Sequence, residues 1–414
     1  MPKMKSMKKA LVYFQSGGPT PVINSSLYGV IREYHRHPTI FSRLYGAHYG
    51  VEGLIEGDLF DLEQEDLKEI EFLKQTPGQI LGSSRKKLPS FDDPAFAKII
   101  DTIKRFNIGY ILTNGGNDSM DTCYRLSRFF AEKKMDVKIL GIPKTVDNDL
   151  MITDHCVGFP SAARHIMDGA MMAKVDAASY QKGKIVMMEI MGRNAGWLTA
   201  STALLPEEYR PDYIYVPEMK WDWEDFLSQI KAIYEKKKYV FVALSEGAPL
   251  EKQNLQGGDS FGHASNEGVA YTAADVIKER LGISSRVILE STLQRSDVCK
   301  VTKIDSSEAV AVGTFAVRSL VEGETGKMVA LKRVSSHPYR AECVLVGLES
   351  VANYEKKIPS SWIIDNQHMS QEFEDYLKPL ILDLLPVKLE NGVVRCAHLK
   401  LIPAKPENHK GETR

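Results

Sequence analysis

The sequence predicts an α/β protein with two doubly wound, Rossmann-like lobes, mostly parallel sheets and a C-terminal extension packed on the first lobe. Over the first 300 residues, strand-like apolar runs alternate with helix-like amphipathic runs, which is typical of parallel sheets covered by helices. The strand-like runs form two series separated by the loop 143–160, and each series predicts one lobe. We therefore expect residues 1–157 and 296–414 to form one lobe and residues 158–295 the other.

Each predicted strand is a short apolar run bounded by polar or turn-forming residues. The first series comprises residues 10–14, 43–49, 108–114 and 137–142, and the second comprises 184–191, 212–218, 239–246 and 285–291. Helices are predicted between them at 93–106, 119–133, 161–178, 223–238 and 267–281, with Pro21, Ser119 and Ser161 at helix starts. After residue 300 the pattern predicts helices at 304–322 and 369–385 and strands at 327–334 and 341–348.

The composition is that of an ordinary globular protein, with 43% hydrophobic residues, 26% charged residues and a formal net charge of −1. The balanced charge argues against a nucleic-acid partner, and no apolar stretch has the length of a membrane span. The five cysteines are widely spaced with no CxxC pair, so we expect reduced cysteines and a cytoplasmic location.

Two glycine pairs follow predicted strands, at the sheet edge where doubly wound proteins bind their ligands. Gly17 and Gly18 follow the first strand, and GGNDSMD, residues 115–121, follows the third. Such loops let the backbone and a helix N-terminus approach a phosphate. A tight turn explains the first loop equally well. For the second, the simpler interpretation is a glycine turn and a helix capped by Ser119, with Asp118 and Asp121 at the helix start, where acids are favoured without any function.

The end of the fourth predicted strand carries the acidic segment PKTVDNDL, residues 143–150. Asp147 and Asp149 stand two residues apart, so one carboxylate could act as a general base while the other holds a divalent cation. A solvated turn rich in Asp and Asn is the simpler interpretation of this segment alone.

Charged side chains also end two strands of the second series. Glu189 and Arg193 lie in MEIMGRNAGW, where a buried Glu–Arg pair and an arginine that grips phosphate are the two interpretations. Glu246 ends the strand 239–246, and further arginines lie in SSR and LQR segments, at Arg85, Arg286 and Arg295. Phosphate loops, acids and arginines at strand ends together predict phosphoryl transfer, although P-loop and protein-kinase motifs are absent.

Taken as an ordered set, these segments resemble the phosphofructokinase family of the bacterial type. The set is GGPTPVIN, GSSR, GGNDS, PKTVDND, GFPSAARH, MEIMGR, SEG and RVILESTLQR, and it spans residues 15–295. The resemblance is strongest to the pyrophosphate-dependent branch. It implies reversible, Mg²⁺-dependent phosphoryl transfer from pyrophosphate to the 1-hydroxyl of fructose 6-phosphate by a homo-oligomer, a dimer or tetramer with a shared active site. An ATP-dependent enzyme is the alternative, and a non-catalytic sugar-phosphate sensor is disfavoured because Asp147 is present.

The resemblance also implies a role for each matching position. Asp147 would be the base that takes the proton from the 1-hydroxyl, with Lys144 and Asp118 beside the reacting phosphates. The donor would be bound by Gly17, Arg85, Asp118 and Lys144, and magnesium by Asn117 and Asp149. Fructose 6-phosphate would contact Thr145, Val146, Asp147, Met191, Gly192, Arg193, Glu246, Arg286, Thr292 and Arg295, with one of these arginines reaching in from a neighbouring subunit.

Several positions depart from the family's pattern. Asn117 replaces the usual aspartate at the magnesium position, Thr292 replaces a histidine or tyrosine, and Lys184 replaces an intersubunit arginine. Asp118 and Lys144 stand where ATP-using relatives have glycine. A carboxylate at position 118 would repel the α-phosphate of ATP, and a lysine at 144 could hold a short donor, so this pair predicts pyrophosphate.

Overall fold

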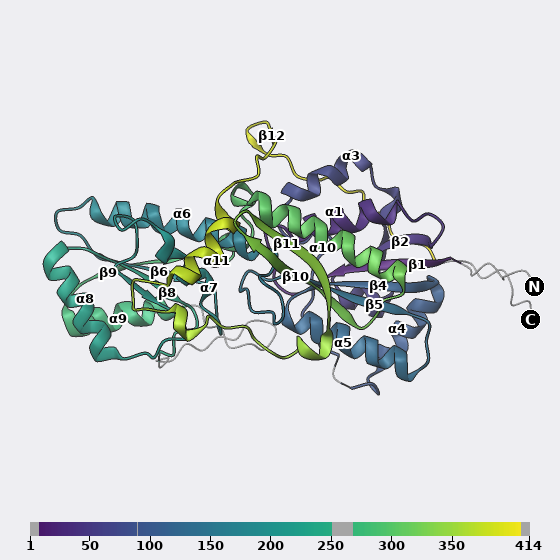
Figure 1. The fold of residues 1–414 in the computed structure, drawn as a ribbon, viewed down its shortest axis with the longest axis horizontal. Coiled ribbons are helices and arrows are strands. Elements are labelled where there is room, and N and C mark those ends of the chain that lie inside the picture. The colour runs from purple at the N-terminus through teal and green to yellow at the C-terminus, as the bar shows by residue number, and fades with distance from the viewer. Residues whose placement is uncertain (1–7, 89, 251–267, 407–414) are drawn as a thin grey trace, which may run out of the picture.

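The computed structural model describes residues 8–88, 90–250 and 268–406, and these residues form two lobes, each around one main β-sheet (Figure 1). In the first lobe the sheet has the order β11-β10-β5-β4-β1-β2-β3. Neighbouring strands are parallel except at the two edges of the sheet, where β3 pairs antiparallel with β2 and β11 pairs antiparallel with β10. The strands are β1 Lys9–Gln15, β2 Phe41–Ala47, β3 Leu59–Asp61, β4 Ile108–Gly115, β5 Lys138–Pro143, β10 Lys327–Ser336 and β11 Tyr339–Gly347.

The second lobe holds a smaller sheet of order β7-β8-β6-β9, in which the paired strands are parallel. Its strands are β6 Ile185–Ile190, β7 Tyr213–Tyr215, β8 Val240–Ser245 and β9 Ser285–Leu289. The strand β9 forms one edge of this sheet and is only partly buried. The predicted fold class, an α/β protein with mostly parallel sheets in two lobes, is confirmed.

Helices cover both faces of the first sheet, which explains why β1 reads as a continuous apolar run. Ala10, Val12 and Phe14 pack with the helices α4 and α5 on one face, whereas Leu11 and Tyr13 pack with α1 and α10 on the other. The helices of the described residues are α1 Ile23–Tyr34, α2 Val51–Glu56, α3 Leu67–Ile70, α4 Pro94–Arg105, α5 Asn117–Glu132, α6 Phe159–Ala178, α7 Trp197–Ser201, α8 Trp223–Lys237, α9 Val269–Leu281, α10 Lys303–Glu322 and α11 Gln371–Ile381.

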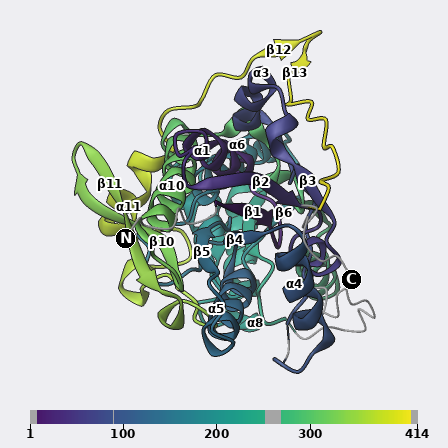
Figure 2. The same ribbon diagram turned by 90° about the vertical axis from the view of Figure 1, so that its right-hand side faces the viewer.

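The C-terminal extension reaches further than the sequence predicts. Its last part lies on the first lobe, where the backbone N–H of Lys400 donates to Glu65 and the strand β3 bridges to Pro403 (Figure 2). The helix α11, in contrast, buries Phe373 and Leu377 in the core of the second lobe. The antiparallel pair β12 Leu389–Glu390 and β13 Val393–Val394 belongs to the same extension. The extension therefore ties the two lobes together.

Local structure agrees with the predicted elements in most places. Every predicted strand is present, and the predicted helices are present within a few residues of their expected ends, although residue 267 lies outside the described residues. The helix α5 begins at Asn117 after Gly116, so Ser119 lies inside the first turn and the prediction that it caps the helix was wrong. The short elements α2, α3, α7 and β3 and the pair β12–β13 were not predicted, because a few residues carry too little periodicity. None of the described helices is long and apolar enough to cross a membrane.

Candidate active site

A buried lysine lies where β1 and β5 end at the same edge of the first sheet. Lys144 directly follows β5 and is 3% exposed, and its Nζ donates a hydrogen bond to the carbonyl oxygen of Gly18 at 2.6 Å. Gly17 adopts φ +77°, and a Cβ there would lie 3.3 Å from the same Nζ, so the loop needs glycine to fit around the lysine. Burial lowers the pKa of Lys144 to about 8, while Asp147 and Asp149 oppose this shift. A solvated surface lysine is therefore excluded.

The acidic segment after β5 is an anchored turn rather than a solvated one. Asn148 at its centre is fully buried and takes φ +55°, a left-handed conformation that asparagine tolerates better than most residues. Its Nδ2 donates to the Tyr376 hydroxyl at 2.9 Å, and its Oδ1 accepts from the Cys156 backbone N–H at 2.9 Å. The side chains on either side, Asp147 and Asp149, are consequently held in fixed directions.

The two carboxylates of this turn share an environment that disfavours their charged forms. Burial raises the pKa of Asp147, and the nearby Glu246 carboxylate raises it further, while Lys144 and the arginines of the site act in the opposite direction. Burial likewise raises the pKa of Asp149, followed by repulsion from Asp147. Raised pKa values in a carboxylate pair are typical of groups that accept a proton or take up a cation.

The oxygen atoms of this region could bind a hard divalent cation at Asp149 more readily than at Asn117. The Asp149 Oδ1 atom is buried and has no hydrogen-bond partner among the described residues. Asn117 is already engaged, since its Nδ2 donates to the Tyr354 carbonyl at 2.6 Å and its Oδ1 accepts from the Asn353 N–H at 3.1 Å. In the described part of the chain, no group of three or more His, Cys, Asp and Glu side chains is arranged around a metal position. A cation here would take most of its oxygen ligands from substrate and water, as Mg²⁺ commonly does.

Asp118 lies at the surface, in the first turn of the helix that follows the second glycine loop. It sits in the first turn of α5 with its side chain 63% exposed, and its Oδ1 lies 3.3 Å from the Nζ of Lys87. An exposed pair of this kind contributes little stability, so the carboxylate remains available to a ligand. Arg85, two residues before Lys87, is close enough to lower the pKa of Lys144, which places its charge beside the same lysine.

The residues expected to bind the sugar include a group at the ends of β6 and β8. The Met191 N–H donates to Gln294 at 3.2 Å, and the Gly192 N–H lies 3.4 Å from an oxygen of Glu246. Gly192 adopts φ +132°, and a Cβ there would lie 2.5 Å from the carbonyl oxygen of Ala195, so this sharp turn requires glycine. The following residue, Arg193, is exposed and lies close enough to Asp147 for its charge to lower the pKa of that carboxyl.

Two predicted residues at the start of the acidic segment contribute in different ways. The Thr145 hydroxyl accepts a hydrogen bond from the Asp147 backbone N–H at 3.1 Å, so it shapes the turn. Val146 is 6% exposed and belongs to the core of the second lobe, which leaves only its backbone available to a ligand.

Arg295 joins the two halves of the site. It ends the 3₁₀ turn Leu293–Arg295 after β9, and a Cβ on Gly18 would lie 3.0 Å from its Nη1 atom. A guanidinium of the second lobe therefore meets the glycine loop of the first. His165 on α6 holds both ends of the loop that carries this arginine, since its Nε2 lies 2.9 Å from Glu290 and its Nδ1 2.8 Å from Asp297.

The His165 clamp predicts a specific pH dependence of stability. Hydrogen bonds to Asp297 and Glu290 outweigh the effect of burial and raise the pKa of His165 from 6.5 to about 9. A raised folded-state pKa means that this stabilisation is fully present below about pH 6.5 and is lost as the pH rises through about 9. We expect His165→Gln to lower the melting temperature at pH 7, with the difference from the unmutated protein shrinking above pH 9. A difference that stays constant from pH 7 to 10 would assign His165 a packing role instead.

Two predicted sugar-binding residues do not join this cluster within one chain. Arg286 lies at the other end of β9, is exposed, and forms an ion pair with Asp176 at 3.1 Å. Thr292 is exposed beside Arg295, where its side chain lies at the surface of the chain. The strand β9 separates Arg286 from Arg295 along its length, so the expectation that one arginine of this set reaches in from a neighbouring subunit stays a prediction.

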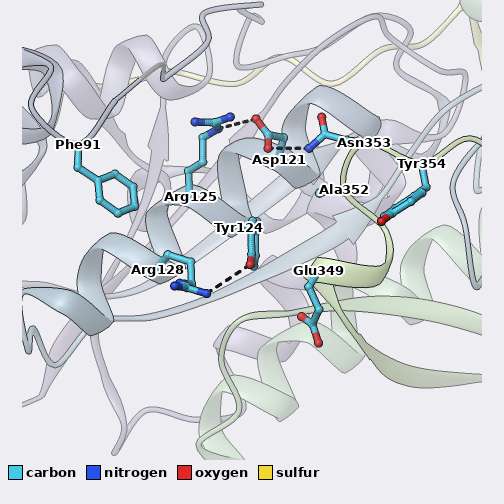
Figure 3. A pocket seen from close by; sticks show the side chains of 9 residues that line it. All are labelled: Phe91, Asp121, Tyr124, Arg125, Arg128, Glu349, Ala352, Asn353 and Tyr354. Carbon is cyan, nitrogen blue, oxygen red and sulfur yellow. Dashed lines mark hydrogen bonds and ion pairs between the residues drawn. The ribbon is translucent and has the colours of Figure 1, made fainter.

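Sequence reasoning missed several residues that shape the site. The sequence did not indicate that Glu189 accepts hydrogen bonds from the N–H groups of Gly268 and Ala270 at the start of α9. The segment 353–358 of the extension also crosses the site. Figure 3 shows its first residue, Asn353, bonded to Asp121. Both residues line a cavity of about 640 Å³ that none of the predicted site residues lines. No local pattern marks either feature, because both depend on contacts distant in sequence.

Comparison with known proteins shows which family this chain resembles along its length. The family model described as phosphofructokinase matches residues 10–320. A relative from Halomonas elongata, named pyrophosphate–fructose 6-phosphate 1-phosphotransferase, is 35% identical over 398 residues, which cover 94% of this chain and 95% of the relative. A relative from Alkalicoccus urumqiensis, named sulfofructose kinase, is 31% identical over 380 residues, covering 91% of this chain and 96% of the relative.

A solved structure supports the same assignment at the level of the whole fold. The crystal structure of a pyrophosphate-dependent phosphofructokinase from Marinobacter aquaeolei matches with a TM-score of 0.85 at 33% sequence identity. The match covers 97% of this chain and 98% of that one. The chain therefore belongs to the phosphofructokinase family.

Proposed function

We propose that this protein is a pyrophosphate-dependent phosphofructokinase, which transfers a phosphoryl group reversibly from pyrophosphate to the 1-hydroxyl of fructose 6-phosphate. The observation that carries the proposal is the meeting of Lys144, the Gly17–Gly18 loop, the Asp147–Asp149 turn and Arg295 between the two lobes. Relatives that match nearly the whole chain carry names with this activity.

In this mechanism Asp147 is the base that accepts the proton of the 1-hydroxyl as the phosphoryl group is transferred. Its raised pKa suits proton uptake near neutral pH. Lys144 and Arg85 balance the negative charge of the phosphates, which is the main task of an enzyme in phosphoryl transfer. Arg193, Glu246 and the backbone around Gly192 would orient the sugar.

We propose Mg²⁺ as the divalent cation of this reaction. Asp149 would hold it through the Oδ1 atom that lacks a hydrogen-bond partner in the described chain, with Asn117 as a weaker neighbour. When bound, the ion would neutralise the charge of the donor phosphates. The remaining ligands would come from the pyrophosphate and from water.

The acceptor site is proposed to be shared between copies of the chain. Arg286 lies on the edge strand β9, whose Leu289 is 36% exposed, and it pairs with Asp176 of α6, the helix that carries the exposed Met172 and Val175 at 63% and 49%. An open strand edge with apolar neighbours suits contact with a second copy, which would bring Arg286 to the partner's site. A monomer in sedimentation velocity at assay concentrations would refute this part of the proposal.

We propose that the protein is located in the cytoplasm. All five of its cysteines are free, which is consistent with that reducing compartment.

A direct assay tests the proposed function. Purified protein with Mg²⁺ and fructose 6-phosphate is offered pyrophosphate or ATP separately, and formation of fructose 1,6-bisphosphate is measured. The proposal requires turnover with pyrophosphate. A clear preference for ATP would favour the ATP-dependent alternative, and absence of turnover with both donors would favour a sugar-phosphate sensor. An acceptor with a sulfonate in place of the 6-phosphate belongs in the same assay, because one relative is named sulfofructose kinase.

Arg295 is expected to serve the sugar rather than the donor. Arg295→Ala should raise the KM for fructose 6-phosphate at least tenfold, because a guanidinium that grips a phosphate contributes roughly 1.5–3 kcal/mol. The KM for pyrophosphate should stay within about threefold, which initial-rate kinetics with each substrate varied in turn would measure. Arg280→Ala is the matched control, since Arg280 pairs with Glu224 at an exposed site. Because Arg295 also lies beside Gly18, a defect mainly in pyrophosphate KM would mean that the two ends of the site are reversed.

A further inference from the structure

The segment 353–358 of the C-terminal extension, called the strap below, begins on the first lobe beside the donor side of the site. The Asn353 N–H donates to Asn117 at 3.1 Å, and the Asn117 amide donates back to the Tyr354 carbonyl at 2.6 Å. The Asn353 side chain adds a bond to Asp121 at 3.1 Å, which is drawn in Figure 3. Three hydrogen bonds thus fasten this end of the strap to the first turns of α5.

The other end of the strap is fastened to the second lobe. Asn194, in the loop after β6, donates to Glu355 at 2.6 Å. The Trp197 indole donates to the Lys356 carbonyl at 3.0 Å, and the Ile358 N–H donates to Glu218 at 3.0 Å. The strap is therefore hydrogen-bonded to both lobes and connects them beside the site.

Lys356 occupies the centre of the strap and contacts the acidic turn directly. Its backbone N–H donates to the Asp149 carbonyl at 2.7 Å. Its Nζ donates to Asn148 Oδ1 at 3.2 Å and to the carbonyls of Thr153 and Asp154 at 3.2 and 2.9 Å. All three N–H donors of the ammonium group are used, so these bonds fix the position of the Lys356 side chain and hold the acidic turn at the same time.

This arrangement matters because Asn148 lies between the two carboxylates that the reaction needs. A left-handed residue has few alternatives that keep its neighbours in place, and any change of its φ or ψ turns Asp147 and Asp149 relative to each other. Displacing a catalytic group by about 1 Å can cost on the order of a hundredfold in rate. A cation that holds Asn148 by its side chain is therefore suited to fix the direction of both.

We propose that the strap is a positioning element and that Lys356 orients the Asp147–Asp149 turn through Asn148. Lys356 touches neither substrate in this role and acts through the turn. The inference rests on the proposed phosphoryl transfer, and it assigns a catalytic purpose to a part of the chain that lies beyond residues 10–320, the region matched by the family model.

The test compares Lys356→Met with Lys357→Met in the full-length protein. Lys357 is the exposed neighbour, so its replacement makes the same chemical change outside the turn. We expect Lys356→Met to lower kcat at least thirtyfold while the KM values for both substrates change less than threefold, because binding groups stay in place. Binding of fructose 6-phosphate without pyrophosphate, measured by calorimetry, should be unchanged. Lys356→Arg should recover part of kcat, since a guanidinium keeps the charge and several donors.

Asn148→Gly provides a second route to the same answer. Glycine tolerates the left-handed conformation but removes the Oδ1 atom, so kcat should fall as it does in Lys356→Met. The double variant should lose little more than either single one, because both remove the same link. The inference would be overturned if the double variant lost kcat by the product of the two single losses, or if either single variant lowered kcat less than threefold. It would also be overturned if substrate binding fell by as large a factor as kcat. If the unmutated protein itself has no pyrophosphate-dependent turnover, the proposed function fails instead, so the two failures are distinguishable.

Discussion

Asp147→Ala is expected to lower kcat by three or more orders of magnitude while the KM for fructose 6-phosphate changes only a few-fold. The base acts chiefly in the transition state, where the 1-hydroxyl gives up its proton, and contributes little to ground-state binding. The loss should be largest of all single substitutions, because the rigid turn around Asn148 leaves no neighbouring carboxylate free to move into place. Steady-state kinetics with pyrophosphate as the donor measures it.

Asp147→Asn is the matched control for this prediction. The amide keeps the size of the side chain and its place in the turn, so folding and sugar binding should be preserved while proton acceptance is lost. Both variants should therefore show nearly equal losses in kcat. A loss below tenfold in either variant would remove Asp147 from the role of base, and Asp149 would be the next candidate.

The second large effect is expected when the two residues that distinguish the donor site are replaced. Asp118→Gly should admit ATP weakly, as a slow substrate or an inhibitor, and adding Lys144→Gly should reduce pyrophosphate turnover at least a hundredfold. Removing the buried lysine leaves the Gly18 carbonyl without its partner and takes a buried positive charge out of the proposed donor site. Competition assays with ATP against pyrophosphate measure both changes.

The size of the Asp118 effect depends on how well its charge is screened. At about 5 Å, one like-charge pair costs roughly 3 kcal/mol at an effective dielectric of 20 and about 1 kcal/mol in water. The exposure of Asp118 and its pairing with Lys87 move the expected cost toward the lower value. Asp118→Gly should therefore improve ATP binding several-fold rather than a hundredfold.

Lys87→Met provides the matched control for this donor filter. It removes the screening cation and should strengthen the exclusion of ATP, the opposite of Asp118→Gly. If the unmutated protein prefers ATP, or if neither variant changes the response to ATP, Asp118 does not select the donor. Its carboxylate would then be a candidate metal ligand that supports Asn117.

The sequence alone determined the fold class, the strands and the identity of the loops at their ends. A buried parallel strand such as β1 must be apolar on both faces, and the loop that follows must bend sharply, so both features are written into a few adjacent residues. For the same reason Gly17, Lys144 and Asp147 could be singled out by the segments that contain them. The position of each in its own loop depends only on its neighbours.

The tertiary structure decided what those loops meet. Burial of Lys144 depends on Gly18, which lies 126 residues away, and the anchoring of Asn117 depends on residues 353 and 354, more than 230 residues away. Arg286 and Arg295 look equivalent in sequence, yet the length of β9 separates them. Contacts of this range arise only when separate elements pack, because periodicity within an element reports which face is buried and says nothing about which partner covers it.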